Sequence, residues 1–296
     1  MKILLFGKGG QVGWELQRSL APLGELVALD FDSAELCADF TRPGGLAQTI
    51  RQVRPDIIVN AAAHTAVDKA ENETELARTL NALSPGVLAE EAERLGAWLV
   101  HYSTDYVFDG SGQGPWVETD APSPINVYGL TKLEGEQLVI ANCQRHLIFR
   151  TSWVYAARGG NFAKTMLRLA QERERLTVID DQIGAPTGAD LLADVTAHAL
   201  RQVQHQPEAA GLYHLVAGGE TSWHGYAQYV IEHARRSPVA STIRATTVDP
   251  VPTTAFPTPA RRPLNSRLAT DRLRTVFSLT LPPWQKGVER MLAEIL

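Results

Sequence analysis

The architecture of this chain follows from one stretch near its N-terminus, Lys2-Ile3-Leu4-Leu5-Phe6-Gly7-Lys8-Gly9-Gly10-Gln11-Val12-Gly13. The apolar run at residues 3–6 predicts a short buried strand, and an amphipathic pattern that continues to Leu20 predicts the helix after it. Glycines between a strand and a helix permit a tight turn and let a pyrophosphate approach the backbone at the helix N-terminus. We therefore interpret Gly7, Gly10 and Gly13 as a dinucleotide-binding loop.

The first half of the chain repeats this alternation of short apolar runs with amphipathic helical patterns. Continuous apolar runs are typical of parallel strands that are buried on both faces. Their alternation with helices predicts an α/β fold of the Rossmann type, with a doubly wound parallel sheet. The predicted strands are residues 3–6, 26–29, 57–59, 98–100 and 147–149.

In the second half of the chain, apolar runs and helical patterns alternate less regularly. This half is predicted to form a smaller C-terminal substrate-binding domain. A run of prolines favours an extended loop over residues 249–263, because proline disrupts helix interiors and sheet centres. We expect an NAD(P)-binding Rossmann domain at residues 1–152 and the second domain at 153–296, with some segments of the second returning to the first. The other predicted elements are helices at 162–173, 189–204, 221–236 and 285–296 and a strand at 212–216.

Composition restricts the class of protein. The 296 residues are 44% hydrophobic and 21% charged, which is ordinary for a globular protein. A net charge of −5 argues against a nucleic-acid partner, because such proteins usually carry a basic surface. We expect no membrane association, since no apolar run reaches the ~18 residues of a membrane helix. The two cysteines, Cys37 and Cys143, favour free thiols in a reducing compartment, and we predict a cytoplasmic protein.

Three residues form a candidate catalytic set. Tyr128 and Lys132 are four residues apart, which places them on one face of a helix. A tyrosine titrates at about 10 in water, and a nearby ammonium favours the phenolate and lowers that pKa. Thr104 follows a predicted strand, where its hydroxyl could bind the same substrate oxygen as Tyr128. The set predicts proton exchange with a substrate oxygen near neutral pH.

Asp30 lies at the end of the second predicted strand, 17 residues after Gly13. An acid at this position can accept hydrogen bonds from an adenosine ribose. The alternative is an ordinary solvated acid at a strand end.

Together, the glycine loop, Thr104 and Tyr128-x-x-x-Lys132 resemble the extended short-chain dehydrogenase/reductase superfamily. Within that superfamily the chain is similar to the dTDP-4-dehydrorhamnose reductase family over essentially its whole length. The long motifs that carry this resemblance are residues 60–71, 150–155, 181–187 and 262–268, and Ser103-Thr104-Asp105-Tyr106-Val107-Phe108-Asp109-Gly110.

The resemblance implies an NAD(P)H-dependent oxidoreductase that reduces the C4 ketone of dTDP-4-dehydro-β-L-rhamnose. Tyr128 would donate the proton, Lys132 would lower the tyrosine pKa and hold the nicotinamide ribose, and Thr104 would tune Tyr128. Sugar-nucleotide contacts are implied at Thr104, Asp105 and Trp153. Cofactor contacts of NADPH or NADH are implied at Tyr128, Lys132, Gly10, Gln11, Val12, Asp30, Asp39, Phe40, Ala63, His64, Thr65 and Tyr102.

Structural roles stay open for several of these residues. Trp153 could fill the core, Asp39 and Phe40 could form a turn, and His64 could be a hydrogen-bonded strand-end histidine. Three arginines in the C-terminal half could bind a diphosphate through bidentate hydrogen bonds or could form a solvated basic loop: Arg261, Arg262 and Arg267.

The resemblance also implies a homodimer bridged by Mg²⁺, with carboxylates at Glu15, Asp190 and Glu294; the alternative is three solvated surface acids. Two other functions stay open. One is a reductase of another nucleotide 4-ketosugar, and the other is a non-catalytic regulatory subunit resembling that of methionine adenosyltransferase. The intact catalytic set, Thr104, Tyr128 and Lys132, favours the enzyme.

Overall fold

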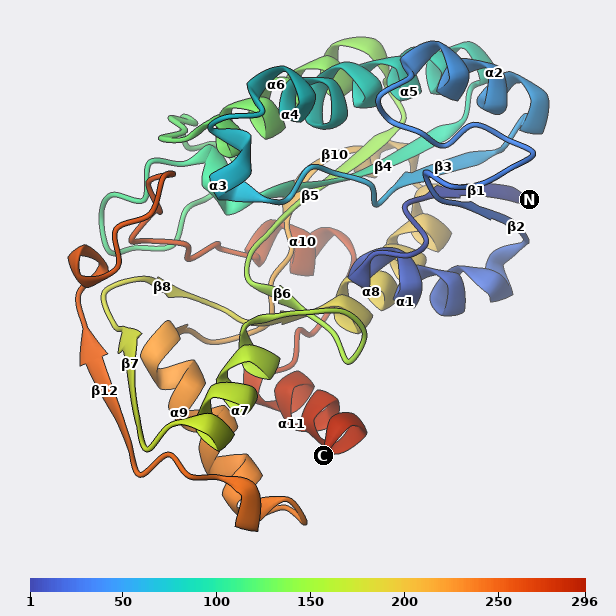
Figure 1. Ribbon diagram of the computed structural model, residues 1–296. Helices are drawn as coiled ribbons and strands as arrows, with labels where there is room; N and C mark the ends of the chain where they lie inside the picture. The colour runs from blue at the N-terminus through green and yellow to red at the C-terminus, as the bar shows by residue number, and fades with distance from the viewer.

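A six-stranded parallel sheet forms the centre of the computed structural model, which describes residues 1–296 except for the side chain of Ala240. Its strand order is β10-β5-β4-β3-β1-β2. Helices cover both faces of the sheet, with α2, α5 and α6 on one side and α1 and α8 on the other (Figure 1). The strands are β1 (Lys2–Phe6), β2 (Glu25–Leu29), β3 (Ile57–Asn60), β4 (Trp98–Thr104), β5 (His146–Thr151) and β10 (Gly211–His214).

The helices alternate with these strands through the first half of the chain, as predicted for a doubly wound fold. A π-helical turn, Thr79–Leu83, joins α4 to α5. The helices are α1 (Gln11–Leu20), α2 (Pro43–Val53), α3 (Val67–Ala70), α4 (Thr74–Arg78), α5 (Ser84–Leu95), α6 (Val127–Asn142), α7 (Phe162–Glu172), α8 (Ala189–Val203), α9 (Trp223–Arg235), α10 (Asp271–Val276) and α11 (Trp284–Ile295).

The core explains why the strands carry continuous apolar runs. Alternate residues of β1 enter two different clusters, because successive side chains of a strand point to opposite faces. Ile3 and Leu5 pack with α1 and α8, whereas Leu4 and Phe6 pack with α2 and α5. The predicted parallel sheet buried on both faces is therefore confirmed.

The second half of the chain contributes to both parts of the molecule. β10 pairs with β5 at the edge of the sheet, and α8 packs against α1, so these segments return to the first part as expected. Helices α7, α9 and α11 pack around Tyr226 in a separate cluster below the sheet (Figure 1). Short strand pairs connect this region: β6 (Val154–Tyr155) with β9 (Thr187–Gly188), β8 (Ile183–Gly184) with β11 (Thr221–Ser222), and β7 (Arg175–Ile179) with β12 (Thr247–Val251). The domain boundary at residue 152 stays a prediction.

The prediction of an extended loop over residues 249–263 was wrong at its start. Residues 249–251 belong to β12, which pairs in parallel with β7 even though it contains Pro250. β12 has a partner on one side only, and proline is tolerated on such an edge strand because no ladder hydrogen bond is needed from its nitrogen.

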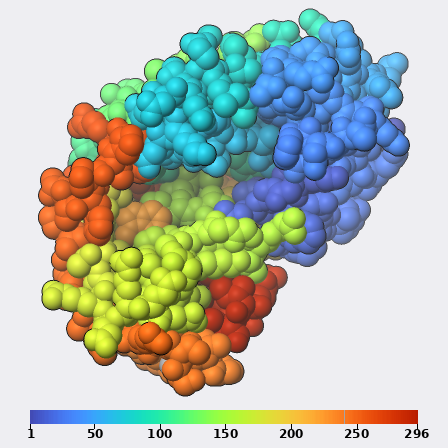
Figure 2. Space-filling model, viewed as in Figure 1, coloured from blue at the N-terminus to red at the C-terminus, as the bar shows by residue number. Residues whose placement is uncertain are grey.

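A recess separates the sheet-bearing part from the part built of α7, α9 and β12 (Figure 2). It lies at the carboxyl ends of the sheet strands, where open α/β sheets bind their ligands. No helix in the described chain has the length and apolar character needed to cross a membrane.

Candidate active site

The predicted catalytic residues meet at the carboxyl edge of the sheet. Thr104 is the last residue of β4, and Tyr128 and Lys132 lie in the first two turns of α6. Asn126 fixes the start of α6, because its side-chain oxygen accepts a hydrogen bond from the Gly129 N–H at 2.8 Å. The structure thus brings together three residues that are separated by up to 28 positions in the sequence.

The Thr104 hydroxyl organises this edge. It donates to Asp105 Oδ1 at 3.1 Å and accepts from the Tyr106 N–H at 3.1 Å. Thr104 also opposes the rise of the Tyr128 pKa, so its hydroxyl lies near the Tyr128 hydroxyl. The Tyr106 ring meets the Tyr128 ring edge to face, with centroids 5.6 Å apart.

Lys132 is buried and contacts β4. Its Nζ donates to the Tyr102 carbonyl oxygen at 2.5 Å and lies 3.3 Å from His101 Nε2. Asn60 holds the other side of this imidazole, with Nδ2 3.0 Å from His101 Nδ1. The ammonium of Lys132 is thereby tied to the sheet.

Burial shifts the pKa values of Tyr128 and Lys132 in opposite directions, because desolvation disfavours the charged form of each group. Burial raises the pKa of Tyr128 to about 12, and Thr104 only partly opposes this effect. Burial also lowers the pKa of Lys132 to about 8. The predicted lowering of the Tyr128 pKa by Lys132 stays a prediction.

Asp105 is a buried acid beside the reacting groups. Burial raises its pKa to about 7, although hydrogen bonds from Ser266 and Thr104 oppose the shift. Its Oδ2 atom has no hydrogen-bond partner among the described residues. A buried, unpaired carboxyl oxygen next to Tyr128 fits the predicted contact with a polar substrate.

The glycine loop has the geometry that a dinucleotide needs. Gly7 adopts φ +83°, and a Cβ on Gly13 would come within 1.9 Å of the Gly7 carbonyl oxygen. Gly10 caps α1 and offers no side-chain partner to its first N–H groups. Free backbone donors at a helix N-terminus fit a pyrophosphate. Gln11 and Val12 open α1 directly after this loop.

Asp30 closes the loop from β2. Its Oδ2 accepts from the Gly9 N–H at 2.7 Å and its Oδ1 from the Phe31 N–H at 2.9 Å. Asp39 forms a turn with Thr41, and the Phe40 side chain is buried against Phe6. Asp39 thus has a turn contact and Phe40 a core contact, and the predicted cofactor contacts of both residues stay predictions.

The segment after β3 runs beside the catalytic edge. The His64 N–H donates to Asn81 Oδ1 at 2.8 Å, and its Nε2 lies 2.8 Å from Glu73 Oε2. Ala63 is half-buried and Thr65 exposed. The Tyr102 hydroxyl lies 2.6 Å from Thr196 Oγ1, so this side chain belongs to the core.

A cavity of about 550 Å³ opens beside the catalytic edge and extends between α7, α9 and β7. Tyr106 and Arg262 line the end that lies nearest Tyr128. Arg262 is held by Asp68 at 2.7 Å, and Arg267 is held by Glu220 at 2.7 Å. Of the two, only Arg262 lines the cavity.

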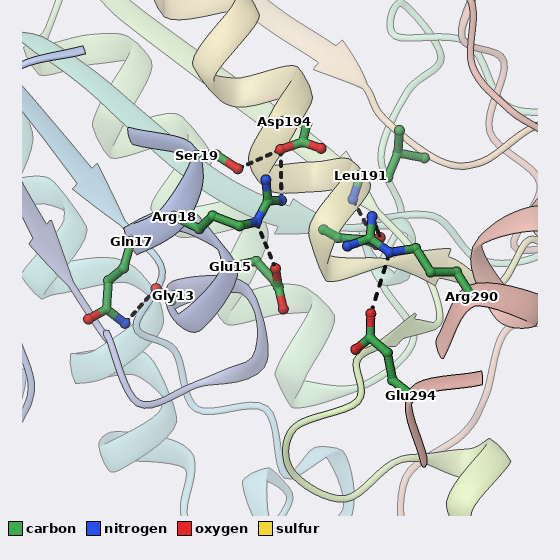
Figure 3. A network of polar contacts seen from close by, with 10 residues as sticks. Gly13, Glu15, Gln17, Arg18, Ser19, Leu191, Asp194, Arg290 and Glu294 are labelled. Carbon is green, nitrogen blue, oxygen red and sulfur yellow. Dashed lines mark hydrogen bonds and ion pairs between the residues drawn. The ribbon is translucent and has the colours of Figure 1, made fainter. Parts of the chain in front are cut away.

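The three predicted metal ligands border one small cavity, but arginines already neutralise them. Asp190 pairs with Arg290 at 3.2 Å. Figure 3 shows the other two pairs, Glu294 with Arg290 at 3.4 Å and Glu15 with Arg18 at 3.5 Å. Within the described residues, no group of three or more His, Cys, Asp or Glu side chains is arranged to hold a metal ion. This arrangement does not fit Mg²⁺ in the single chain.

Two site residues escaped the sequence analysis. Asn81 lies in the π-helical turn and joins His64 to Thr131, the neighbour of Lys132, through side-chain hydrogen bonds. Ser266 reaches Asp105 from the far end of the chain. Ser266 lies in the motif at residues 262–268, but neither its proximity to Asp105 nor the contacts of Asn81 could be predicted, because the partners are distant in sequence.

These features define a class: a Rossmann-type oxidoreductase of the extended short-chain dehydrogenase/reductase group, with a Thr-Tyr-Lys site at the sheet edge. The family model described as "RmlD substrate binding domain" matches residues 1–296. The dTDP-4-dehydrorhamnose reductase of Salmonella typhimurium is 63% identical over 100% of this chain and 98% of that protein. This chain belongs to the dTDP-4-dehydrorhamnose reductase family.

Solved structures agree with this assignment. A dTDP-4-dehydrorhamnose reductase from Clostridium acetobutylicum has a TM-score of 0.89 and 34% identity, covering 100% of this chain and 99% of that one. The enzyme of the same name from Bacillus anthracis, solved in complex with NADP, has a TM-score of 0.87 and 35% identity, covering 99% of both chains. A UDP-glucose 4-epimerase from Thermus thermophilus, 19% identical with a TM-score of 0.81, shares the fold.

Proposed function

We propose that this chain reduces the C4 ketone of dTDP-4-dehydro-β-L-rhamnose to dTDP-β-L-rhamnose with NADPH or NADH, the last step of dTDP-rhamnose biosynthesis. The observation that carries the proposal is the placement of Thr104 at the end of β4 beside Tyr128, with Lys132 one turn further on α6. Two relatives that are 63% and 61% identical to this chain are named dTDP-4-dehydrorhamnose reductase.

Tyr128 is the proton donor. Its raised pKa keeps the hydroxyl protonated at neutral pH, as a group that protonates a developing alkoxide must be. Thr104 orients that hydroxyl and is itself oriented by Asp105. Lys132, with a pKa of about 8, can hold or release a proton near neutral pH. These residues therefore supply the proton that the C4 oxygen needs.

The nicotinamide cofactor would supply the hydride when bound. The loop at Gly7, Gly10 and Gly13 would hold its pyrophosphate, and Asp30 would face the adenosine ribose. Asp105 and Trp153 would bind the sugar, and the large cavity would take the nucleotide. Tyr106 and Arg262 line the part of that cavity beside Tyr128, which places a cation where a diphosphate could bind.

A panel of nucleotide 4-ketosugars tests the proposal. The purified chain is mixed with each ketosugar and NADPH, and the loss of cofactor absorbance is followed. We expect the dTDP-4-dehydrorhamnose reaction to have the highest kcat/KM. Faster reduction of a ketosugar on another nucleotide would assign the chain to that substrate, and no turnover with any of them would favour a non-catalytic role.

We also propose a homodimer. A Mg²⁺ ion bridging two chains at Glu15, Asp190 and Glu294 would have to displace the Arg290 guanidinium from two of these acids. Light scattering with and without EDTA separates the possibilities. A mass that halves in EDTA supports a metal bridge, and a mass that stays unchanged removes it.

A further inference from the structure

Trp153 has a backbone conformation that its surroundings must maintain. Its φ is +50°, in the left-handed region that bulky residues rarely adopt. It lies between β5 and β6, at the carboxyl edge of the sheet, and its carbonyl oxygen accepts the Thr187 N–H at 3.2 Å. Such a conformation persists only where neighbouring contacts determine it. The position of the Trp153 side chain therefore depends on the residues that pack against its ring.

The Trp223 indole is the main neighbour of that ring. The two rings stack with centroids 3.6 Å apart and an interplanar angle of 15°. Phe162 packs on Trp223 as well, with centroids 4.5 Å apart. Since the Trp153 ring covers one face of Trp223 and Phe162 lies against it too, Trp223 is poorly placed to stack on a ligand base.

Gln182 fixes the orientation of Trp223. Its buried side-chain oxygen accepts the Trp223 indole N–H at 3.0 Å. Its side-chain nitrogen donates to Thr253 Oγ1 at 3.0 Å, and that hydroxyl donates to Asp181 Oδ1 at 2.6 Å. Gln182 is thus held at both ends, so the Trp223 ring has a defined rotation.

The Trp153 ring also borders the catalytic cluster. A Cβ on Gly184 would come within 2.8 Å of Trp153 Cε2 and 3.1 Å of Ser266 Cβ, so only glycine fits between them. Ser266 lies near the Asp105 carboxyl, next to Thr104, and opposes the rise of the Asp105 pKa. Trp223 and Gln182, in turn, line the large cavity. A continuous set of contacts therefore runs from the cavity through Trp223 and Trp153 to the catalytic edge.

We propose that Trp223 and Gln182 are positioning residues that hold the Trp153 ring at the sugar end of the substrate. The inference rests on the proposed function, in which Trp153 contacts the sugar. Trp223 acts through the ring stack, and Gln182 acts through the indole hydrogen bond. Loss of either contact lets the Trp153 ring move from its place beside Ser266, and sugar-nucleotide affinity falls while cofactor affinity does not.

The test uses three variants of the full chain: Trp223→Phe, Gln182→Leu and Gln182→Glu. The Glu variant keeps an oxygen acceptor for the Trp223 N–H, and the Leu variant removes it. Trp98→Phe, at the opposite end of β4 from Thr104, controls for the loss of an indole. Circular dichroism reports the exciton couplet of the stacked indoles, and calorimetry measures the Kd of dTDP-β-L-rhamnose and of NADPH.

We expect Trp223→Phe to abolish the couplet and to raise the Kd of dTDP-β-L-rhamnose about 10-fold, the loss expected when an aromatic pair is broken. Gln182→Leu should weaken the couplet and the affinity together. Gln182→Glu keeps the acceptor for the indole N–H but cannot donate to Thr253, so both values should lie between those of Gln182→Leu and wild type. The Kd of NADPH should stay within about 2-fold of wild type in every variant, since none of these residues lies at the glycine loop.

Three results would overturn the inference: a lost couplet with unchanged dTDP-β-L-rhamnose affinity, an equal loss of affinity in Trp98→Phe, or an equal loss of affinity for free dTDP. The last result would mean that Trp223 and Gln182, which line the large cavity, contact the nucleotide directly. Failure of the proposed function looks different. In that case the wild-type chain itself does not bind dTDP-β-L-rhamnose, although its couplet is present.

Discussion

Lys132 Nζ lies 2.5 Å from the carbonyl oxygen of Tyr102, and the described contacts of Lys132 include no hydrogen bond to Tyr128. The lysine is therefore fixed to β4, and Thr104 is the neighbouring side chain that opposes the rise of the Tyr128 pKa. Proton donation then depends first on the Tyr128–Thr104 pair.

Tyr128→Phe should fold and bind NADPH but lose turnover by about 10²- to 10⁴-fold, the range that general acid catalysis supplies. The substitution removes the hydroxyl and keeps the ring that packs on Tyr106. Steady-state kinetics with the dTDP-ketosugar check this, and calorimetry with NADPH controls for folding. A Phe variant within threefold of wild type would remove Tyr128 from the mechanism.

The buried Asp105 carboxyl should lower the free energy of unfolding as pH rises from about 4 to about 7. Its folded pKa, about 7, is above the ordinary 3.8, so between these values the folded chain binds more protons than the unfolded chain. The contribution is most favourable below about pH 4 and is lost as pH rises through 7. Asp105→Asn, which stays neutral, should therefore gain stability relative to wild type from pH 5 to pH 8.

Urea unfolding of both proteins at pH 5 and pH 8 measures this difference. Asp271→Asn, at an exposed acid, is the matched control, and its difference from wild type should change little. If the gap between Asp105→Asn and wild type is the same at both pH values, the Asp105 carboxyl is not held neutral by burial.

Arg150, on β5, and Glu136, one turn after Lys132 on α6, form a buried ion pair that joins the catalytic helix to the sheet. Arg150 Nε and Nη2 donate to the two Glu136 oxygens at 2.9 and 2.6 Å, and both side chains are at most 4% exposed. Arg150→Met should cost about 3–5 kcal/mol, because Glu136 is left buried without its partner. Chemical denaturation checks this. The double variant Arg150→Met with Glu136→Leu should recover much of the lost stability. If the single and double variants lose the same stability, the two residues are not energetically coupled.

Part of this architecture could be predicted from local sequence. The glycine loop and the strands depend on neighbouring residues, and they lie within a few residues of their predicted positions. The helix predicted from residue 221 begins at Trp223, after the short strand β11. The partners of Asp105 and Arg262 could not be predicted. Ser266 and Asp68 reach them from sequence positions more than 150 residues away, and no spacing rule in a single chain specifies such contacts.

Either nicotinamide cofactor should support turnover. The Asp30 carboxyl already accepts two backbone N–H groups, so its charge is partly neutralised, although it should still disfavour a 2′-phosphate. Lys8 lies in the glycine loop and Arg42 lies 12 residues after Asp30, and we expect these cations to offset that repulsion. Kinetics with NADH and NADPH test this. A preference beyond about 1000-fold either way, about 4 kcal/mol, would contradict dual use.

Efficient reduction should require the nucleotide diphosphate on the sugar, so the free ketosugar should be a poor substrate. The reacting ketone is small, and water solvates sugar hydroxyls nearly as well as a protein does, so the sugar alone offers little binding energy. Binding energy from the remote nucleotide must hold the C4 oxygen at Tyr128. The cavity of about 550 Å³, with Arg262 beside Tyr106, has the volume and the cation for this part of the substrate.

The measurement compares the dTDP-linked ketosugar with the free ketosugar at the same NADPH concentration. Loss of the nucleotide should lower kcat/KM by at least ~10³, about 4 kcal/mol of transition-state stabilisation. Added dTDP should not restore the free sugar to the linked rate, because the covalent link is what brings the sugar to Tyr128 at a high effective concentration. Comparable turnover of the free sugar would mean that the sugar alone reaches the catalytic edge, and the cavity between α7, α9 and β7 would then have no part in positioning the ketone.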